Sequence, residues 1–205
     1  FVVVPFTHGC GECPACKAGF DGNCTNNESI GIVGYQGEYL RYSNANWALV
    51  KIPGQPSDYS EGMLNSLLTL ADVMATGYHA AKIAQVKDGD TAVVIGDGAV
   101  GLCGVIGAKL LGAERIIMMS RYKDRQELAL EFGATDIIEE RGDEAVVKVM
   151  ELTNNAGADA VLECVGTKIS IETAVKVCRA GASIGRVGVP QMDEMSTNAL
   201  FWKNI

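Results

Sequence analysis

The second half of the chain alternates short, nearly continuous hydrophobic runs with longer segments in which hydrophobic residues recur every three or four positions. The first pattern is typical of strands buried on both faces, and the second of helices that cover a sheet. We expect strands at 91–96, 115–120, 136–139, 160–164 and 182–189, and helices at 99–111, 123–132, 144–152 and 169–178. Strand and helix in regular succession predict the α/β class, with a doubly wound parallel sheet.

Residues 1–70 lack this regular alternation and contain short hydrophobic stretches among many glycines and polar residues. Such stretches predict short strands in a mainly β region, followed by a helix that Asp58 or Ser60 caps. The expected strands are 1–4, 30–35, 37–42 and 48–52, and the expected helices run from about residue 60 to 71 and from 76 to 84. We therefore expect two domains, 1–70 and 71–205, and the second carries the parallel sheet.

Composition and charge narrow the classes of partner. The 205 residues are 48% hydrophobic with a formal net charge of −8, and no basic surface for nucleic acid or anionic lipid is predicted. The span 92–113 is apolar enough to imitate a membrane helix, but its glycines favour a buried strand, a turn and a helix. A small-molecule partner is expected. Cytoplasmic location is expected too, because Cys103, Cys164 and Cys178 lie in apolar runs as free thiols.

Four cysteines, Cys10, Cys13, Cys16 and Cys24, lie in one glycine-rich loop. A tetrahedral zinc ion takes four thiolates at about 2.3 Å, and this spacing supplies them locally. An iron–sulfur cluster takes the same ligands, and disulfides are a third interpretation. We favour structural zinc, because cysteines three apart pair poorly as disulfides. Protein atoms would then fill all four positions, so this metal would have no open site for chemistry.

The sequence Gly96-Asp-Gly98-Ala-Val-Gly101 joins a predicted strand to a predicted helix. In this context the first glycine permits a tight turn, the second lets the backbone approach a pyrophosphate, and the third allows close helix–strand contact. The free amides at the start of the helix, from Ala99 and Val100 onward, would face the anion. A tight turn without a ligand is the alternative.

The end of the second predicted strand indicates which dinucleotide would bind. An NAD site usually has an acidic residue there, whereas this chain has Ser120, Arg121 and Tyr122. Ser120 removes a carboxylate that would repel a 2′-phosphate, and Arg121 can pair with that phosphate, assisted by Arg125 one turn later. We expect NADP, with NAD as the alternative.

A less specific interpretation of the same arginines remains open. Arg121 and Arg125 would then lie on a solvated helix start, where Asp124 and Glu127 are close enough in sequence to pair with them. Replacing Arg121 and comparing NADPH with NADH distinguishes the two.

Three ordered motifs resemble the zinc-dependent medium-chain alcohol dehydrogenases: the four-cysteine loop, the Thr76–Ala81 segment Thr-Gly-Tyr-His-Ala-Ala, and the glycine turn at 96–101. The resemblance runs over the whole chain. It implies a Rossmann sheet, lacking its last strand, beside a partial, mainly β, GroES-like domain with a structural zinc. It also implies an NADP-linked oxidoreductase that transfers hydride between nicotinamide and an alcohol or carbonyl compound.

The resemblance also implies catalytic residues. Asp72 matches the third ligand of the catalytic zinc, while Thr76 and Val100 match positions beside the nicotinamide. The first two ligands would lie upstream of Phe1, so we expect a central fragment whose catalytic zinc site is incomplete and which is inactive by itself. His79 is two helical turns from Asp72, too far to share one ion. We expect His8 to be a hydrogen-bonded loop residue.

Two other functions are alternatives to the dehydrogenase. One is a truncated protein that binds dinucleotide or a partner without catalysis. The other is a zinc-free quinone reductase relative, against which the four cysteines argue. A homo-oligomer is compatible with the resemblance.

Overall fold

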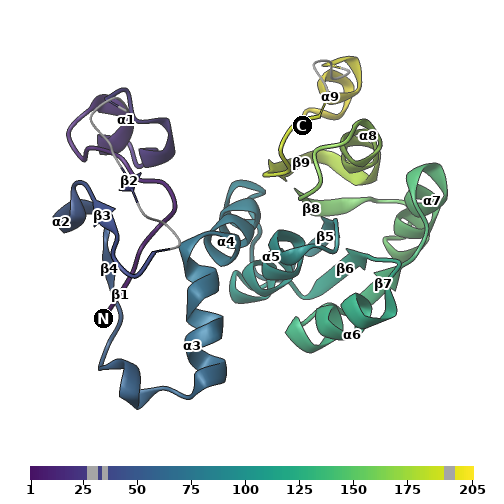
Figure 1. Ribbon diagram of the computed structural model, residues 1–205. Helices are drawn as coiled ribbons and strands as arrows, with labels where there is room; N and C mark the ends of the chain where they lie inside the picture. Colours follow the sequence, from purple (N-terminus) through teal and green to yellow (C-terminus); the bar gives the residue numbers. More distant parts are fainter. Residues whose placement is uncertain (27–31, 34–36, 192–196) are drawn as a thin grey trace. The chain divides into compact units, whose positions relative to one another are not determined.

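A computed structural model of the protein describes residues 1–26, 32–33, 37–191 and 197–205. The chain forms two compact units, Phe1–Asp72 and Val73–Ile205 (Figure 1). No helix among the described residues is both long and apolar enough to cross a membrane.

The unit Val73–Ile205 is built on a five-stranded sheet in the order β7-β6-β5-β8-β9, with every neighbouring pair parallel. Its strands are β5 (Thr91–Ile95), β6 (Arg115–Met119), β7 (Asp136–Ile138), β8 (Ala158–Glu163) and β9 (Cys178–Arg186). Its helices are α4 (Val73–Ile83), α5 (Ala99–Leu110), α6 (Lys123–Phe132), α7 (Gly142–Leu152), α8 (Lys168–Val177) and α9 (Thr197–Lys203). The predicted α/β class and the doubly wound parallel sheet are confirmed.

Alternating residues of the central strand divide the core of this unit into two hydrophobic clusters. Ala92 and Val94 of β5 pack in a cluster with residues of α4, α5 and α6. Val93 and Ile95 pack in the other cluster, with residues of α7 and α8. All four side chains are buried, as expected for a strand covered on both faces.

Helices α4 and α5 approach one another closely through glycines. A Cβ atom on Gly77 would lie 2.5 Å from the backbone nitrogen of Gly104, and one on Gly107 would lie 2.9 Å from the Cα of Tyr78. Both distances are shorter than a carbon contact allows, so these positions require glycine for the observed crossing.

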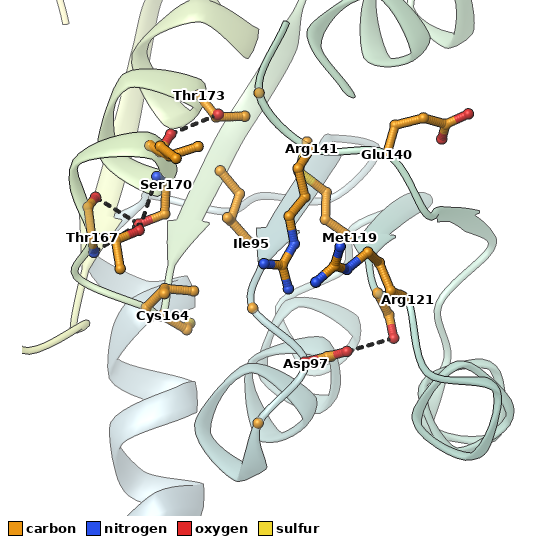
Figure 2. Close-up of a pocket in the computed structure, with 16 residues that line it drawn as sticks. Ile95, Asp97, Met119, Arg121, Glu140, Arg141, Cys164, Thr167, Ser170 and Thr173 are labelled. Carbon is orange, nitrogen blue, oxygen red and sulfur yellow. Dashed lines mark hydrogen bonds between the residues drawn. The ribbon is translucent and has the colours of Figure 1, made fainter. Parts of the chain in front are cut away.

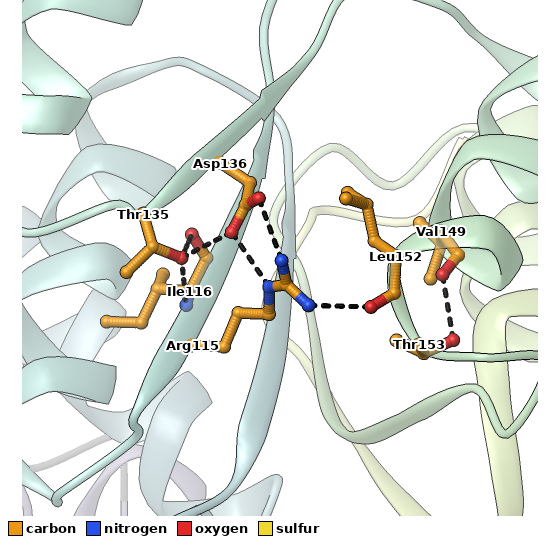
Figure 3. A network of polar contacts seen from close by, with 7 residues as sticks. All are labelled: Arg115, Ile116, Thr135, Asp136, Val149, Leu152 and Thr153. Atoms are coloured by element: carbon orange, nitrogen blue, oxygen red, sulfur yellow. Dashed lines mark hydrogen bonds and ion pairs between the residues drawn. The ribbon is translucent and has the colours of Figure 1, made fainter.

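An ion-pair network fixes the edge strand β7 to its neighbours (Figure 3). The guanidinium of Arg115 on β6 donates from Nε and Nη2 to the two carboxylate oxygens of Asp136 on β7, at 2.9 and 3.2 Å. Its Nη1 donates to the carbonyl of Leu152 at the end of α7, at 2.6 Å. One side chain therefore joins β6, β7 and α7.

Sequence prediction missed helix α9 in this unit, and it also misplaced the start of the last strand. That strand begins at Cys178, not at residue 182, and the register shifts between Ala158 and Ala160. In the sequence, Gly181 suggests a turn after a helix, and in the structure it has φ +71. Pairing with β8 prevails, because Arg179 donates to the carboxylate of Asp159 at 2.6 Å and holds the early residues in the sheet.

The unit Phe1–Asp72 contains two small antiparallel ladders. β1 (Val2–Val3) pairs with β4 (Val50–Lys51), and β2 (Ile32–Val33) pairs with β3 (Arg41–Tyr42). The strands β1, β3 and β4 are shorter than predicted, and most of the predicted 30–35 strand lies outside the described residues. The remaining elements are α1 (Pro14–Lys17), η1 (Asp21–Asn23), α2 (Ala45–Ala48), η3 (Pro56–Asp58), α3 (Glu61–Leu68) and η4 (Thr69–Ala71).

Helix ends in the first half of the chain follow local capping chemistry. Ser60 is the N-cap of α3, and its hydroxyl accepts a hydrogen bond from the Met63 amide at 3.2 Å. Helix α4 begins at Val73, three residues before the predicted start at 76. Helix α2 was not predicted, because it follows Asn44 in the left-handed conformation rather than a recognisable cap.

Candidate functional site

The four cysteines of the N-terminal loop converge on one point. Their Sγ atoms all lie within 4.8 Å of one another; Cys13 is 3.4 Å from Cys16 and 3.8 Å from Cys24. Four thiolates at about 2.3 Å from a tetrahedral zinc ion would lie about 3.8 Å apart, so this donor set fits zinc. Among the described residues it is the one cluster of three or more potential metal ligands.

Backbone amides around the loop point at the sulfurs. The amides of Glu12 and Cys13 donate to Cys10 Sγ at 3.4 and 3.3 Å, and these bonds lower the Cys10 pKa. The pKa of Cys13 is lowered to about 5, first by the Cys16 amide. Burial raises the pKa of the Cys16 thiol to about 12, and a coordinated cation would remove that proton. The backbone amides of the loop thus stabilise the thiolates of Cys10 and Cys13, and Cys16 depends on a bound cation.

Small residues and one tryptophan shape the space around the cysteines. A Cβ atom on Gly9 would collide with the Cys16 sulfur, and one on Gly11, at φ +77, would lie 2.7 Å from the Trp47 ring. Trp47 comes from α2, and its Nε1 donates to Asp21 Oδ2 at 3.2 Å. The unpredicted helix α2 therefore places a ring over the loop.

His8 differs from its expected role as a hydrogen-bonded loop residue. Its side chain is buried, and within the described part of the chain neither ring nitrogen has a hydrogen-bond partner. The ring instead stacks on Tyr42, with centroids 4.3 Å apart. Stacking explains the burial of this residue without a metal.

A cavity of about 530 Å³ opens in the unit Val73–Ile205, at the carboxyl ends of β5, β6 and β8 (Figure 2). In open α/β sheets this edge is where ligands bind. The predicted residues Gly96, Gly98, Ser120 and Arg121 line it. Sequence reasoning missed other lining residues, among them Asp97, Glu140, Arg141, Cys164, Thr167 and Ser170.

Each of the three glycines in the turn between β5 and α5 has a different structural role. Gly96 adopts φ +108, a conformation that other residues rarely take. Gly98, the N-cap of α5, would place a Cβ in open space, so a ligand can approach its backbone. A Cβ on Gly101 would overlap the carbonyl oxygen of Gly96. Ala99 and Val100 lie in the first turn of α5. The backbone N–H groups of a first helical turn have no acceptor within the helix, so a ligand can bind them.

Asp97, inside the glycine turn, links it to the next strand. Its carboxylate accepts from the Ser120 hydroxyl at 2.9 Å and from Arg125 Nη1 at 3.0 Å. Burial acts to raise the Asp97 pKa, but these two hydrogen bonds and the Arg125 charge outweigh it and hold that pKa below its ordinary value. Arg125 is therefore already paired. Its partner is neither Asp124 nor Glu127, and its guanidinium also stacks 4.9 Å from the Tyr122 ring centroid.

The two residues implied as catalytic lie four positions apart in sequence and in different units. Asp72 is exposed and follows η4 at the end of Phe1–Asp72, and Thr76 is half-buried in the first turn of α4. Asp72 belongs to no group of three metal ligands in the described part of the protein. The residues described here thus do not assemble a second metal site.

The known proteins that are similar to this chain are described as dehydrogenases. Residues 99–205 match a family described as zinc-binding dehydrogenase. The chain is 37% identical over 200 residues to the zinc-type alcohol dehydrogenase B of Aspergillus flavus, covering 92% of this chain and 45% of that protein. It is 36% identical over 154 residues to the NADP-dependent isopropanol dehydrogenase of Clostridium beijerinckii, covering 75% and 42%.

A solved structure is similar over nearly the entire chain. The apo form of zinc dependent alcohol dehydrogenase 2 from Streptococcus pneumonia superposes with a TM-score of 0.84 at 28% identity. The match covers 99% of this chain and 57% of that one. The chain thus spans about half the length of the relatives that it matches.

Proposed function

Because the chain belongs to the zinc-dependent medium-chain alcohol dehydrogenases, we propose that it forms the central portion of an NADP-linked alcohol dehydrogenase. The observation that carries the cofactor part is the cavity at the carboxyl ends of the strands, where Gly98 leaves its backbone open. The same cavity has Ser120 and Arg121 where an NAD site usually has an acid.

The residues predicted to bind the cofactor have distinct roles in this proposal. The amides of the first turn of α5, from Gly98 through Val100, bind the pyrophosphate, and the turn at Gly96 and Gly101 holds them in place. Arg121 pairs with the 2′-phosphate. Tyr122 and Arg125 do not line the cavity; they are proposed to assist Arg121 from beside it, and Arg125 acts mainly by holding Asp97.

Cys10, Cys13, Cys16 and Cys24 hold the structural zinc in the proposal, which keeps their loop folded and leaves no position open for substrate. When bound, the nicotinamide exchanges hydride with an alcohol or carbonyl compound. Thr76 and Val100 are proposed to contact the nicotinamide. Asp72 is proposed as a ligand of a catalytic zinc, but it belongs to no group of three potential ligands among the described residues, so no chemical step is assigned to it.

Replacing Arg121 by Ala tests the cofactor assignment. Loss of a charge-assisted contact of about 1.5–3 kcal/mol should weaken NADPH binding, measured by fluorescence titration, by about 10- to 100-fold. NADH binding should change less than about twofold, because NADH lacks the 2′-phosphate. An unchanged preference between the two cofactors would remove the role of Arg121.

A protein that binds dinucleotide without catalysis is the second candidate for the 205-residue chain. What supports it is that the one group of three or more potential metal ligands among the described residues is the four-cysteine loop, which has no position open for substrate. We expect no alcohol-dependent reduction of NADP by the zinc-loaded chain, measured as absorbance at the wavelength of NADPH. Robust turnover would refute this expectation.

A further inference from the structure

Arg141 lines the same cavity as the glycine turn, although it follows a different strand from the predicted cofactor residues. It ends the connection after β7 and is the N-cap of α7. The next residue, Gly142, adopts φ +59, so the chain turns sharply between the cavity and the helix. Figure 2 shows the Arg141 guanidinium directed into the cavity.

Arg121 and Arg141 approach this cavity from two adjacent strands. β6 and β7 are hydrogen-bonded neighbours, and the two residues follow their carboxyl ends. Figure 2 shows their guanidinium groups pointing toward one another. Within the described ranges, neither has an ion-pair partner. Glu140 lines the same cavity, but its carboxylate points away from both arginines in Figure 2.

Two like charges that face one another repel, and a bound anion between them removes that cost. Asp97 does not supply the negative charge, because its carboxylate is paired with Arg125 and hydrogen-bonded to Ser120. The arrangement therefore leaves two guanidinium forks for an external anion with several acceptor oxygens.

We propose that Arg141 is a specificity-determining residue that, together with Arg121, holds the 2′-phosphate of NADP from two sides. The inference rests on the proposed NADP specificity and adds a second cationic residue from β7. A phosphate monoester carries a charge of about −1.5 to −2 at neutral pH, which two guanidinium groups match.

The segment that carries Arg141 is held at both ends. On one side, Glu139 accepts from Gln126 Nε2 of α6 at 3.0 Å. On the other, Asp143 pairs with Lys176 of α8 at 2.6 Å. Both contacts lie at the surface, and they connect the segment around Arg141 to α6 and α8.

The test compares Arg141→Ala with Lys148→Ala in the zinc-loaded 205-residue chain. Lys148 lies on the same helix, is half-exposed and does not line this cavity, so its replacement is a matched change of charge. The probes are NADPH, NADH, 2′,5′-ADP and 5′-AMP, titrated by calorimetry. Arg141→Ala should weaken NADPH and 2′,5′-ADP about 10- to 100-fold and change NADH and 5′-AMP less than about twofold. Arg141→Lys should lose less, because it keeps the charge.

The outcomes separate this inference from the proposed function. If the wild-type chain prefers NADPH, and Arg121→Ala abolishes that preference while Arg141→Ala does not, the role of Arg141 is overturned and the proposed function stands. Equal weakening of NADPH and NADH by Arg141→Ala also overturns it, because the residue would then act on the shared part of the cofactor. If the wild-type chain shows no preference for NADPH, both fail.

Discussion

Replacement of Asp97 by Asn is expected to lower stability while raising the affinity for NADPH. The Asp97 side chain is 13% exposed and that of Arg125 is 45% exposed, so solvent screens the pair and limits its worth to about 0.5–1 kcal/mol. The bond from Ser120 persists to an Asn oxygen but loses charge assistance, a further 0.5–1 kcal/mol or so. The expected loss is roughly 1–2 kcal/mol in the free energy of unfolding.

The affinity for NADPH should increase when Asp97 is replaced by Asn. Asp97 borders the cavity, and its carboxylate holds Arg125 away from a phosphate there. Without that charge, NADPH should bind severalfold more tightly, because Arg125 is released. Opposite signs for stability and affinity are not expected from a substitution that merely damages the fold.

The pH dependence gives a third readout. The folded-state pKa of Asp97 is lowered, so its contribution is present in full above the unfolded pKa of about 3.9 and is lost as pH falls through the folded value. The stability difference between wild type and Asp97→Asn should therefore be constant from pH 7 to about pH 5 and shrink at lower pH.

Urea unfolding followed by circular dichroism measures these differences, and cofactor titration measures the affinity. Glu172→Gln is the control, because it removes one negative charge from a weak pair at 3.9 Å outside the cavity. That control should change stability by less than about 0.5 kcal/mol. The reasoning is refuted if Asp97→Asn leaves stability at pH 7 unchanged, or if NADPH affinity falls.

Three further predictions concern other parts of the fold. Cys13→Ser should abolish tight zinc binding, measured by metal analysis, and unfold the cysteine loop without changing the NADPH dissociation constant; retained zinc at one ion per chain would contradict it. Gly77→Val should separate α4 from α5 and cost at least about 2–3 kcal/mol in urea unfolding, because its Cβ would meet the Gly104 nitrogen at 2.5 Å. Lys203→Met should expose α9 to proteolysis, since the Lys203 ammonium donates to three carbonyls at the end of α8, at 2.8–3.0 Å; unchanged cleavage would oppose this role.

Sequence reasoning succeeded where local pattern and final structure agree. Helix α6 spans 123–132 as predicted, because Gly133, at φ +122, ends a segment without internal breakers. It failed at β9, where Cys178 and Arg179 look like the end of a helix until Asp159 of another strand is known. Local propensity could not reveal a contact between residues twenty positions apart.

In the candidate site, too, local features were predicted and contacts between distant residues were not. The glycine turn was evident from spacing, but the pairing of Asp97 with Ser120 and Arg125 joins residues 23 and 28 positions apart. Sequence alone did not identify Arg141 as a cofactor residue, because it follows the third strand of the sheet and belongs to no recognised motif. The parallel order of the sheet supplies the one clue that could have found it, since neighbouring strands end at one edge.

The ratio of the NADH to the NADPH dissociation constant, measured on the zinc-loaded wild-type chain at physiological salt, tests the central claim most directly. Two guanidinium groups facing one cavity should favour NADPH by at least about tenfold. Raising the salt should reduce this ratio, because the added contact is ionic. Equal constants, or tighter binding of NADH, would contradict the account.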